Sequence, residues 1–196
     1  MLSYFAMIWE EKDPSAADLV TQIRLRMERD GLAPYSHFAR PGLELFDFSR
    51  LPFGGNILAL PNSPDGMGGA IFGSLFDRSG KSLSAPDIAA SDPPFSSRIC
   101  RSRGDELLRD YWGSYIGFLD CGDRFVVVRD PSASLPCFHA DQCGVTLVFS
   151  HLQDCRFIDR SAFTLNRDFI SKLLIYDKVQ TGETGLNEVR ELLGGE

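Results

Sequence analysis

Residues 106–151 read ELLRDYWGSYIGFLDCGDRFVVVRDPSASLPCFHADQCGVTLVFSH, and this stretch decides the fold. Its first residues, 106–111, predict a short helix that ends near Gly113, because glycine readily takes the positive φ of a helix terminus. Successive side chains of residues 114–120 alternate in character, which predicts a strand with two different faces. The stretch therefore begins with one helix that leads into a sheet.

Two turns divide the remainder into antiparallel strands. Gly122 supplies the left-handed conformation that the first turn, residues 121–123, requires. The apolar run 125–128 is typical of a strand covered on both faces, and we expect it at the centre of a sheet. A second turn at residues 141–144 leads into the strand 145–150. Apolar residues on both sides of these strands predict layers above and below the sheet.

The first part of the chain predicts a long helix over residues 14–30. Asp13 can cap this helix, Pro14 suits its first position and Gly31 can end it. Its apolar residues recur at helical spacing and indicate a face laid on a sheet: Ala16, Val20, Ile23 and Met27. Further strands are predicted over residues 3–9, 36–40, 43–48, 56–60 and 69–76. Residues 81–94, rich in Ser, Ala, Asp and Pro, are predicted to form a surface excursion.

Composition limits the class of protein. The chain has 196 residues, 43% of them hydrophobic, which suits a single domain over residues 1–196 with a sizeable core. No segment approaches the roughly 20 apolar residues of a membrane span, and the first residues lack the basic start of a signal peptide. A formal net charge of −7 argues against a nucleic-acid partner, whose phosphates favour a basic face. We expect a cytoplasmic protein that binds neither nucleic acid nor a membrane.

The cysteines and histidines do not indicate a metal site. The five cysteines lack CxxC spacing and stand at positions 100, 121, 137, 143 and 155. An odd number without a secretory signal predicts reduced thiols, most of them buried as small hydrophobic residues. Cys137 and Cys143 flank a turn and could approach each other. The histidines at positions 37, 139 and 151 are scattered along the chain.

The order of residues in the central stretch matches a known family. That family shows a short helix, a glycine, a strand ending in Asp, a hairpin, a strand ending in Arg-Asp, a loop ending in Pro-Leu-Tyr and a strand ending in Ala-Ser-Glu. The matching residues are Gly113, Phe118, Asp120, Arg129, Asp130, Leu135, Pro136, Phe138 and Ser150. In the tail, residues 181–184 match Thr-Gly-Glu-Thr, while Leu193 and Gly195 match Leu-x-Pro-Gly with Gly194 in place of proline. On these residues the chain resembles the amino-terminal half of the asparagine synthetase family, a type 2 glutamine amidotransferase domain.

The resemblance implies a fold and a reaction. The fold would be α+β, a four-layer αββα sandwich of two antiparallel sheets, as in N-terminal-nucleophile (Ntn) hydrolases. The reaction would be glutamine hydrolysis, in which a cysteine directly after the initiator methionine attacks the amide and its free α-amino group serves as base. This chain has Leu2 at that position. Ser3 could serve as a nucleophile only if two residues were removed.

Two supporting motifs of the family are also missing. Its Arg-His-Arg-Gly-Pro-Asp segment corresponds to residues 29–34, which read RDGLAP. Its Asn-Gly-Glu segment, whose amide stabilises the oxyanion, corresponds to Phe72, Gly73 and Ser74. We therefore expect a degenerate glutamine site, and predict no catalytic, cofactor-binding or metal-ligating residue in this chain.

Members of the family that lack the glutaminase still carry an ATP-dependent synthetase half. β-Lactam synthetases and lasso-peptide cyclases use an internal amine and need no ammonia, and the first twenty residues resemble those of lasso-peptide cyclases. The pyrophosphate-binding signature Ser-Gly-Gly-x-Asp does not occur here, so ATP and Mg²⁺ are expected only in a synthetase domain downstream. The expected partners are that domain and a peptide substrate, and a homodimer is left open.

Two alternatives to this function remain. The chain could be a free-standing, non-catalytic binding or scaffold domain of the same fold. It could also be a hydrolase with an unorthodox nucleophile, either Ser3 or a cysteine brought into the old pocket.

Three further segments are candidates for contacts. Arg129 and Asp130 end the apolar strand and could contact substrate or partner, or else anchor the loop that leads to Pro136. The excursion 81–94 and the arginines of residues 98–103 are candidate contacts with the partner domain, although such charge runs are commonly solvated.

Overall fold

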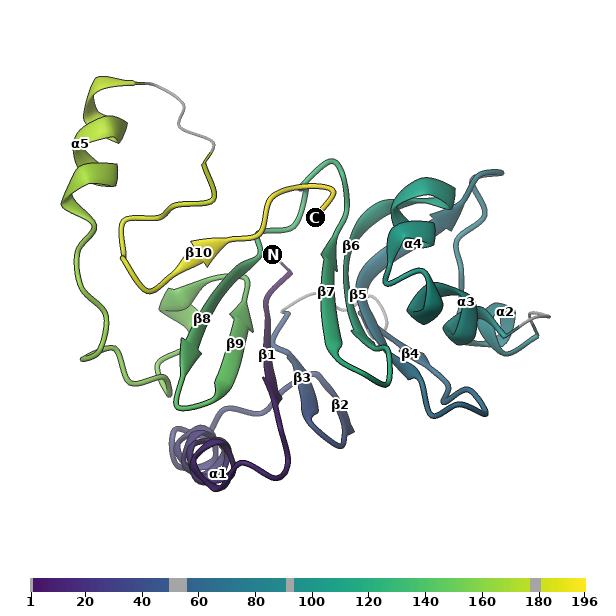
Figure 1. Ribbon diagram of the computed structural model, residues 1–196, viewed down its shortest axis with the longest axis horizontal. Coiled ribbons are helices and arrows are strands. Elements are labelled where there is room, and N and C mark those ends of the chain that lie inside the picture. The colour runs from purple at the N-terminus through teal and green to yellow at the C-terminus, as the bar shows by residue number, and fades with distance from the viewer. Residues whose placement is uncertain (1, 50–55, 91–93, 177–180) are drawn as a thin grey trace.

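The computed structural model describes residues 2–49, 56–90, 94–176 and 181–196, and two antiparallel sheets form its centre (Figure 1). The six-stranded sheet has the order β10 (Arg190–Glu191), β8 (Phe138–Gln142), β9 (Val145–Phe149), β1 (Tyr4–Trp9), β3 (Leu43–Asp47) and β2 (Ser36–Arg40). The four-stranded sheet has the order β4 (Ile57–Leu60), β5 (Gly68–Asp77), β6 (Tyr111–Asp120) and β7 (Phe125–Arg129). The predicted α+β class with two antiparallel sheets is confirmed.

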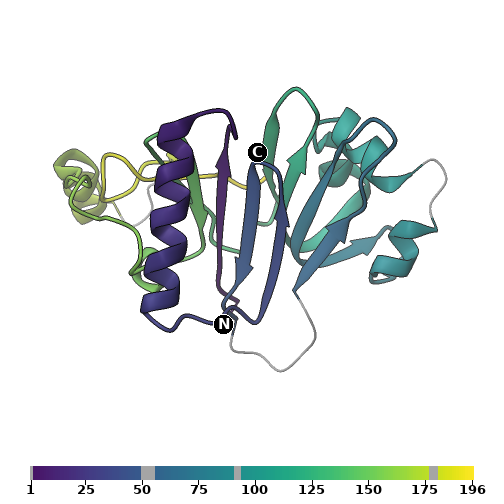
Figure 2. The same cartoon turned by 90° about the horizontal axis from the view of Figure 1, so that it is seen from below.

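Helix α1 (Pro14–Arg29) covers the outer face of the six-stranded sheet (Figure 2). The carboxylate of Asp13 accepts a hydrogen bond from the backbone N–H of Ser15 at 2.9 Å, which satisfies one of the free donors at the helix start. The four apolar residues predicted to face the sheet are all buried. Gly31 follows the helix with φ of 65°, so both predicted ends of this helix are confirmed to within one residue.

Three short helices cover the outer face of the four-stranded sheet: α2 (Ala85–Ala89), α3 (Phe95–Arg101) and α4 (Asp105–Asp110). Helix α2 lies within the predicted excursion 81–94, so that expectation was incomplete; residues 91–93 of the excursion lie outside the described residues. The prolines of this segment favour a loop, but Pro86 lies in the first turn of α2, where proline is tolerated. Ser84 and Asp87 form a capping box there, and Ile88 is buried against the sheet.

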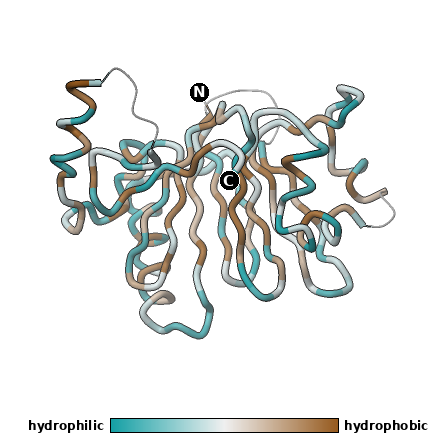
Figure 3. Tube along the Cα trace, turned by 45° about the horizontal axis from the view of Figure 1, so that its top comes forward, coloured by the Kyte–Doolittle hydropathy of each residue, from teal (hydrophilic) through white to brown (hydrophobic). Residues whose placement is uncertain are grey.

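Apolar side chains fill three separate spaces, and hydrophobic residues follow the central strands (Figure 3). One cluster lies between α1 and the six-stranded sheet and includes Phe5, Val20, Ile23 and Phe149. The second lies between the two sheets and includes Tyr4, Leu45, Phe72 and Phe118. The third lies under α2, α3 and α4 and includes Ile71, Leu75, Ile88 and Leu107. Each of these large side chains contributes roughly 1.5–3 kcal/mol through burial, which holds helix, sheet, sheet and helix together as layers.

Strand β7 is an edge strand, which corrects its predicted central position. Among the described strands it pairs with β6, whereas β5 and β6 occupy the centre. Its apolar run arises from the layers, because Val128 packs under the helices and Val127 packs between the sheets. The free edge is covered near Arg129, whose N–H donates to the Glu196 carbonyl at 2.8 Å.

The boundary between α4 and β6 also differs from the prediction. Helix α4 ends at Asp110 and β6 begins at Tyr111, so Gly113 lies within a strand and does not end a helix. Gly113 has φ of 143°, and a Cβ there would lie 2.1 Å from the carbonyl oxygen of Ser74. Glycine is thus required by the close approach of β5 and β6.

Candidate functional site

The amino end of β1, where the family would place its nucleophile, is held by hydrogen bonds. The nitrogen of Ser3 donates to Ser49 Oγ at 3.0 Å, and Ser3 Oγ donates to the carboxylate of Asp154 at 2.9 Å. Ser150 Oγ lies 3.4 Å from Ser3 Oγ. Ser3 is 7% exposed, and Leu2 packs against the cluster between the sheets. In the part of the chain described, the partners of Ser3 Oγ are a carboxylate and a hydroxyl, which favours a structural role for this serine.

Phe72 is the residue that the sequence resemblance aligns with the family's oxyanion-stabilising amide. Its side chain is fully buried between the sheets, and its ring centroid lies 4.7 Å from that of Tyr4. The Tyr4 hydroxyl donates to the Pro136 carbonyl at 3.0 Å, and burial raises the pKa of Tyr4 well above its usual value. This place in the core therefore carries an aromatic pair and offers no polar side chain from position 72 to a substrate.

A cavity of about 1220 Å³ opens beside Ser3, between the end of α1 and the 3-10 helix η1 (Leu152–Asp154). The described residues that line it are Ser3, Asp30, Gly31, Leu32, Ala33, Tyr35, Phe48, Ser49, Gln153, Asp154 and Arg156. Four of them come from residues 29–34, where the family has two arginines and a histidine, and they bring one carboxylate to the cavity. The expected loss of the family's substrate-binding segment rests on the sequence of residues 29–34 and stays a prediction.

Two buried cysteines, Cys137 and Cys155, are poorly suited to nucleophilic attack. Burial raises the pKa of Cys137 to about 11 and that of Cys155 to about 12, so both remain protonated near neutral pH. All five thiols are free, with Cys137 buried between the sheets and Cys143 exposed on the β8–β9 turn. Cys137 and Cys143, which lie just before and just after β8, are therefore not joined.

Arg129 fastens two segments that are distant in sequence. Its Nε donates to the Leu135 carbonyl at 2.8 Å and its Nη2 donates to the Ala133 carbonyl at 3.0 Å. Its Nη1 donates to the Glu191 carboxylate at 2.9 Å and to the Leu192 carbonyl. With 3% of Arg129 exposed, these contacts hold the 131–135 loop against the carboxyl-terminal segment.

Asp130 organises the start of the same loop. Its fully buried carboxylate accepts hydrogen bonds from the Ser132 N–H at 2.9 Å, from the Ser132 hydroxyl and from the Ser134 hydroxyl at 3.2 Å. Gly194 packs on this loop, and a Cβ at position 194 would lie 2.7 Å from the Pro131 carbonyl oxygen. The anchoring role weighed for Arg129 and Asp130 fits these contacts, and the tight packing explains why glycine suits position 194.

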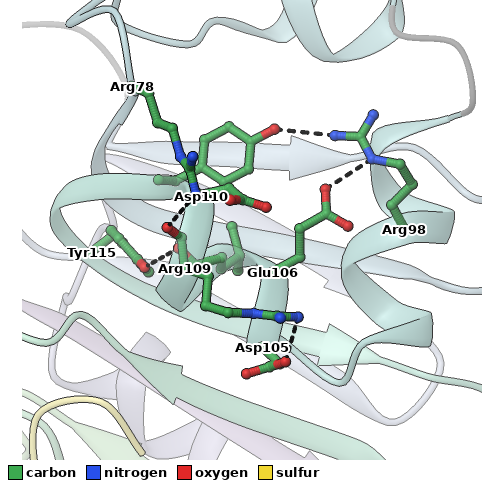
Figure 4. Close-up of polar contacts among 9 residues, drawn as sticks. Arg78, Arg98, Asp105, Glu106, Arg109, Asp110 and Tyr115 are labelled. Atoms are coloured by element: carbon green, nitrogen blue, oxygen red, sulfur yellow. Dashed lines mark hydrogen bonds and ion pairs between the residues drawn. The ribbon is translucent and has the colours of Figure 1, made fainter.

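The arginines of residues 98–103 each pair with a carboxylate. Arg98 contacts Glu106 at 2.9 Å and the Tyr111 hydroxyl at 3.1 Å, and Figure 4 shows this link between α3 and α4. Arg101 pairs with Asp65 at 2.7 Å and Arg103 with Asp123 at 3.1 Å. These pairs fasten α3 and the residues after it to α4 and to two neighbouring segments, so the run is not an unneutralised basic patch.

Helix α5 (Arg167–Ile175) presents a surface that the sequence reasoning missed. No residue of this helix is buried, and the helix stands away from both sheets (Figure 1). The exposed fractions reach 83% for Leu174 and 74% for Ile175, with Leu165, Leu173 and Tyr176 also exposed. The signal in the sequence was the apolar run LLIY at residues 173–176.

Comparison with known proteins does not extend the resemblance. No protein-family model matches the chain, and no curated protein matches it. None of the helices in the described ranges combines the length and apolar character that a membrane span requires. Among the same residues, no group of three or more His, Cys, Asp or Glu is placed to hold a metal ion. Membership of the asparagine synthetase family stays a prediction.

Proposed function

We propose that this chain is the amino-terminal, glutaminase-like domain of an ATP-dependent amide ligase that resembles asparagine synthetase, and that its glutamine site is degenerate. Two stacked antiparallel sheets with helices on both outer faces are what an Ntn-hydrolase-type fold would show. The ordered match from Gly113 to Ser150 supports the same proposal. In this proposal the domain carries no cofactor, while ATP and Mg²⁺ bind to the synthetase domain.

The observation that carries the degenerate site is the packing of Phe72. A glutaminase needs a polar donor where charge develops on the substrate oxygen, and here that position holds a fully buried ring against Tyr4. Leu2 brings an alkyl group to the position of the nucleophile. Loss of both groups removes attack and oxyanion stabilisation together.

The exposed apolar residues of α5 favour the presence of a partner domain that packs on them, whether on the same chain or on a separate one. A helix of nine residues is marginal in water by itself, since isolated helices shorter than about 12–15 residues rarely persist without packing. Large apolar side chains on such a helix indicate a protein interface. In this proposal the α5 surface packs against the synthetase domain, and the parent ligase is a lasso-peptide cyclase that forms an isopeptide bond in a peptide substrate.

A glutaminase assay tests the degenerate site. The purified chain, incubated with glutamine, is expected to release no more ammonia than a protein-free blank. Saturable release that disappears in a Ser3→Ala variant would establish the hydrolase alternative and refute the proposal.

An add-back experiment tests the partner. The synthetase half of the parent ligase, expressed separately, is expected to gain solubility or turnover when this chain is added. A synthetase half that folds and cyclises its peptide at the rate of the intact ligase without this chain would instead favour the free-standing scaffold alternative.

A further inference from the structure

Cys100 and Cys121 meet at one end of the four-stranded sheet. The Cys100 thiol donates to the carbonyl oxygen of Gly68 at 3.5 Å. Gly68 begins β5 and pairs with Asp120, the residue that precedes Cys121. The two thiols thus border the same pair of strand residues, and Cys121 packs against the apolar cluster that contains Cys100.

The two cysteines differ in access to solvent. Cys100 is 1% exposed on the buried face of α3, whereas Cys121 is partly exposed at the β6–β7 turn. A solution reagent can therefore reach Cys121 before it reaches Cys100. Cys137 and Cys155 are buried in other clusters.

Nearby charged groups affect the pKa values of the two thiols. The hydrogen bond from Cys100 lowers the pKa of Cys121, and the Arg103 guanidinium acts in the same direction, while burial and the carboxylates of Asp120 and Asp123 oppose them. The same hydrogen bond, together with burial, raises the pKa of Cys100. Thiolate character is consequently greater at the accessible sulfur, which is the one a reagent meets.

Arg40 adds a second guanidinium at this end of the sheet. It reaches across from β2 to pair with Asp120 at 2.7 Å and to donate to the Gly66 carbonyl at 2.9 Å. Its buried Nε and Nη1 have no hydrogen-bond partner among the described residues. Its positive charge favours the thiolate form of Cys100 and acts against burial and the Asp120 carboxylate, which both raise the pKa of that thiol.

We propose that Cys100 and Cys121 form a thiol–disulfide exchange site that reacts with small-molecule disulfides and closes to an intramolecular disulfide. The Cys121 thiolate attacks one sulfur of the reagent, forms a mixed disulfide and releases the first thiol, which takes the Cys121 proton. The Cys100 sulfur then attacks the Cys121 sulfur and expels the second thiol, which takes the Cys100 proton. Two protein thiols are oxidised while one small-molecule disulfide is reduced to two thiols.

The product would link α3 to the β6–β7 turn. Such a link closes a loop over residues 100–121 and restricts the unfolded chain, so the oxidised protein is expected to unfold at a higher temperature than the reduced protein. This site is independent of the proposed ligase partnership, since it needs neither α5 nor the cavity beside Ser3.

Mass spectrometry of the full chain tests the proposal. The reduced protein in a Cys143→Ser background is incubated with oxidised glutathione, blocked with N-ethylmaleimide and digested without reduction. A peptide pair linked through Cys100 and Cys121 is expected, and a Cys100→Ser variant is expected to stop at a glutathione adduct on Cys121. A Cys121→Ser variant should give neither product.

The wild-type chain keeps the test decisive if the Cys100→Ser variant does not fold. In a time course, the adduct on Cys121 should appear first and then convert to the linked pair. Absence of the linked pair under conditions that modify Cys143 in the wild-type chain would overturn the proposal.

Discussion

The Asp130→Ala substitution is expected to lower the free energy of unfolding of this domain by about 2 kcal/mol. The Asp130 carboxylate is fully buried and accepts three hydrogen bonds from Ser132 and Ser134. Hydrogen bonds to a charged group contribute roughly 1.5–3 kcal/mol each, and the simple sum would exceed 4 kcal/mol. Ser132 and Ser134 are themselves exposed, so water replaces much of what they lose, and removal of a buried carboxylate offsets part of the rest.

Urea unfolding followed by tryptophan fluorescence measures this loss. The midpoint is expected to fall with an unchanged slope, and the thermal midpoint to fall by about 4–8 °C for a chain of this size. Ser134→Ala, which removes the longest of the three hydrogen bonds, serves as a matched control with an expected loss below about 1 kcal/mol. The anchoring role would be refuted by two results together. The isolated Asp130→Ala domain would have a free energy of unfolding within about 0.5 kcal/mol of the wild type, and the same substitution in the full-length ligase would reduce turnover.

Three further predictions concern the core, the thiols and the α5 surface. Phe72→Asn should not create glutaminase activity, measured as ammonia release. It should lower the free energy of unfolding by about 3 kcal/mol, because it removes a buried ring and buries an amide without a hydrogen-bond partner. Measurable glutamine hydrolysis would contradict the view that nucleophile and donor are lost together. Burial raises the pKa of Cys137 to about 11, so its neutral thiol contributes fully to stability below the pKa of an unfolded thiol, and this contribution is lost as pH rises toward 11. The wild type should therefore lose stability more steeply above about pH 9 than Cys137→Ala does. Equal slopes would show that titration of Cys137 does not cause the loss. The exposed apolar surface of α5 predicts that the isolated chain self-associates. Leu174→Asp, at the 83% exposed side chain, should reduce this self-association in sedimentation and weaken add-back to the synthetase half, with a thermal midpoint within about 2 °C of wild type; a large drop in that midpoint would show that α5 packs within the domain.

The sequence determined the elements whose signals are local. The apolar spacing from Ala16 to Met27, with Asp13 before it and Gly31 after it, defines α1 because a helix buries one face every 3.6 residues. The turn at Gly122 and the apolar runs around it likewise define antiparallel strands. The loss of polar groups at positions 2 and 72 is also readable directly, since it depends on residue type and order.

The tertiary structure alone decided relations between distant segments. The sequence predicts β7 as a central strand because both of its faces are apolar. Strand order depends instead on pairing partners, and β7 is an edge strand whose two faces are covered by the layers above and below the sheet. The sequence predicts Gly113 as a helix end. In the structure a glycine is needed there because the carbonyl oxygen of Ser74, 39 positions earlier, leaves no room for a Cβ. Three further features follow from the packing of separate elements: the proximity of Cys100 and Cys121, the ion pair between Arg129 and Glu191, and the exposure of α5. Such contacts lie outside any local pattern because each is set by the whole arrangement of sheets and helices.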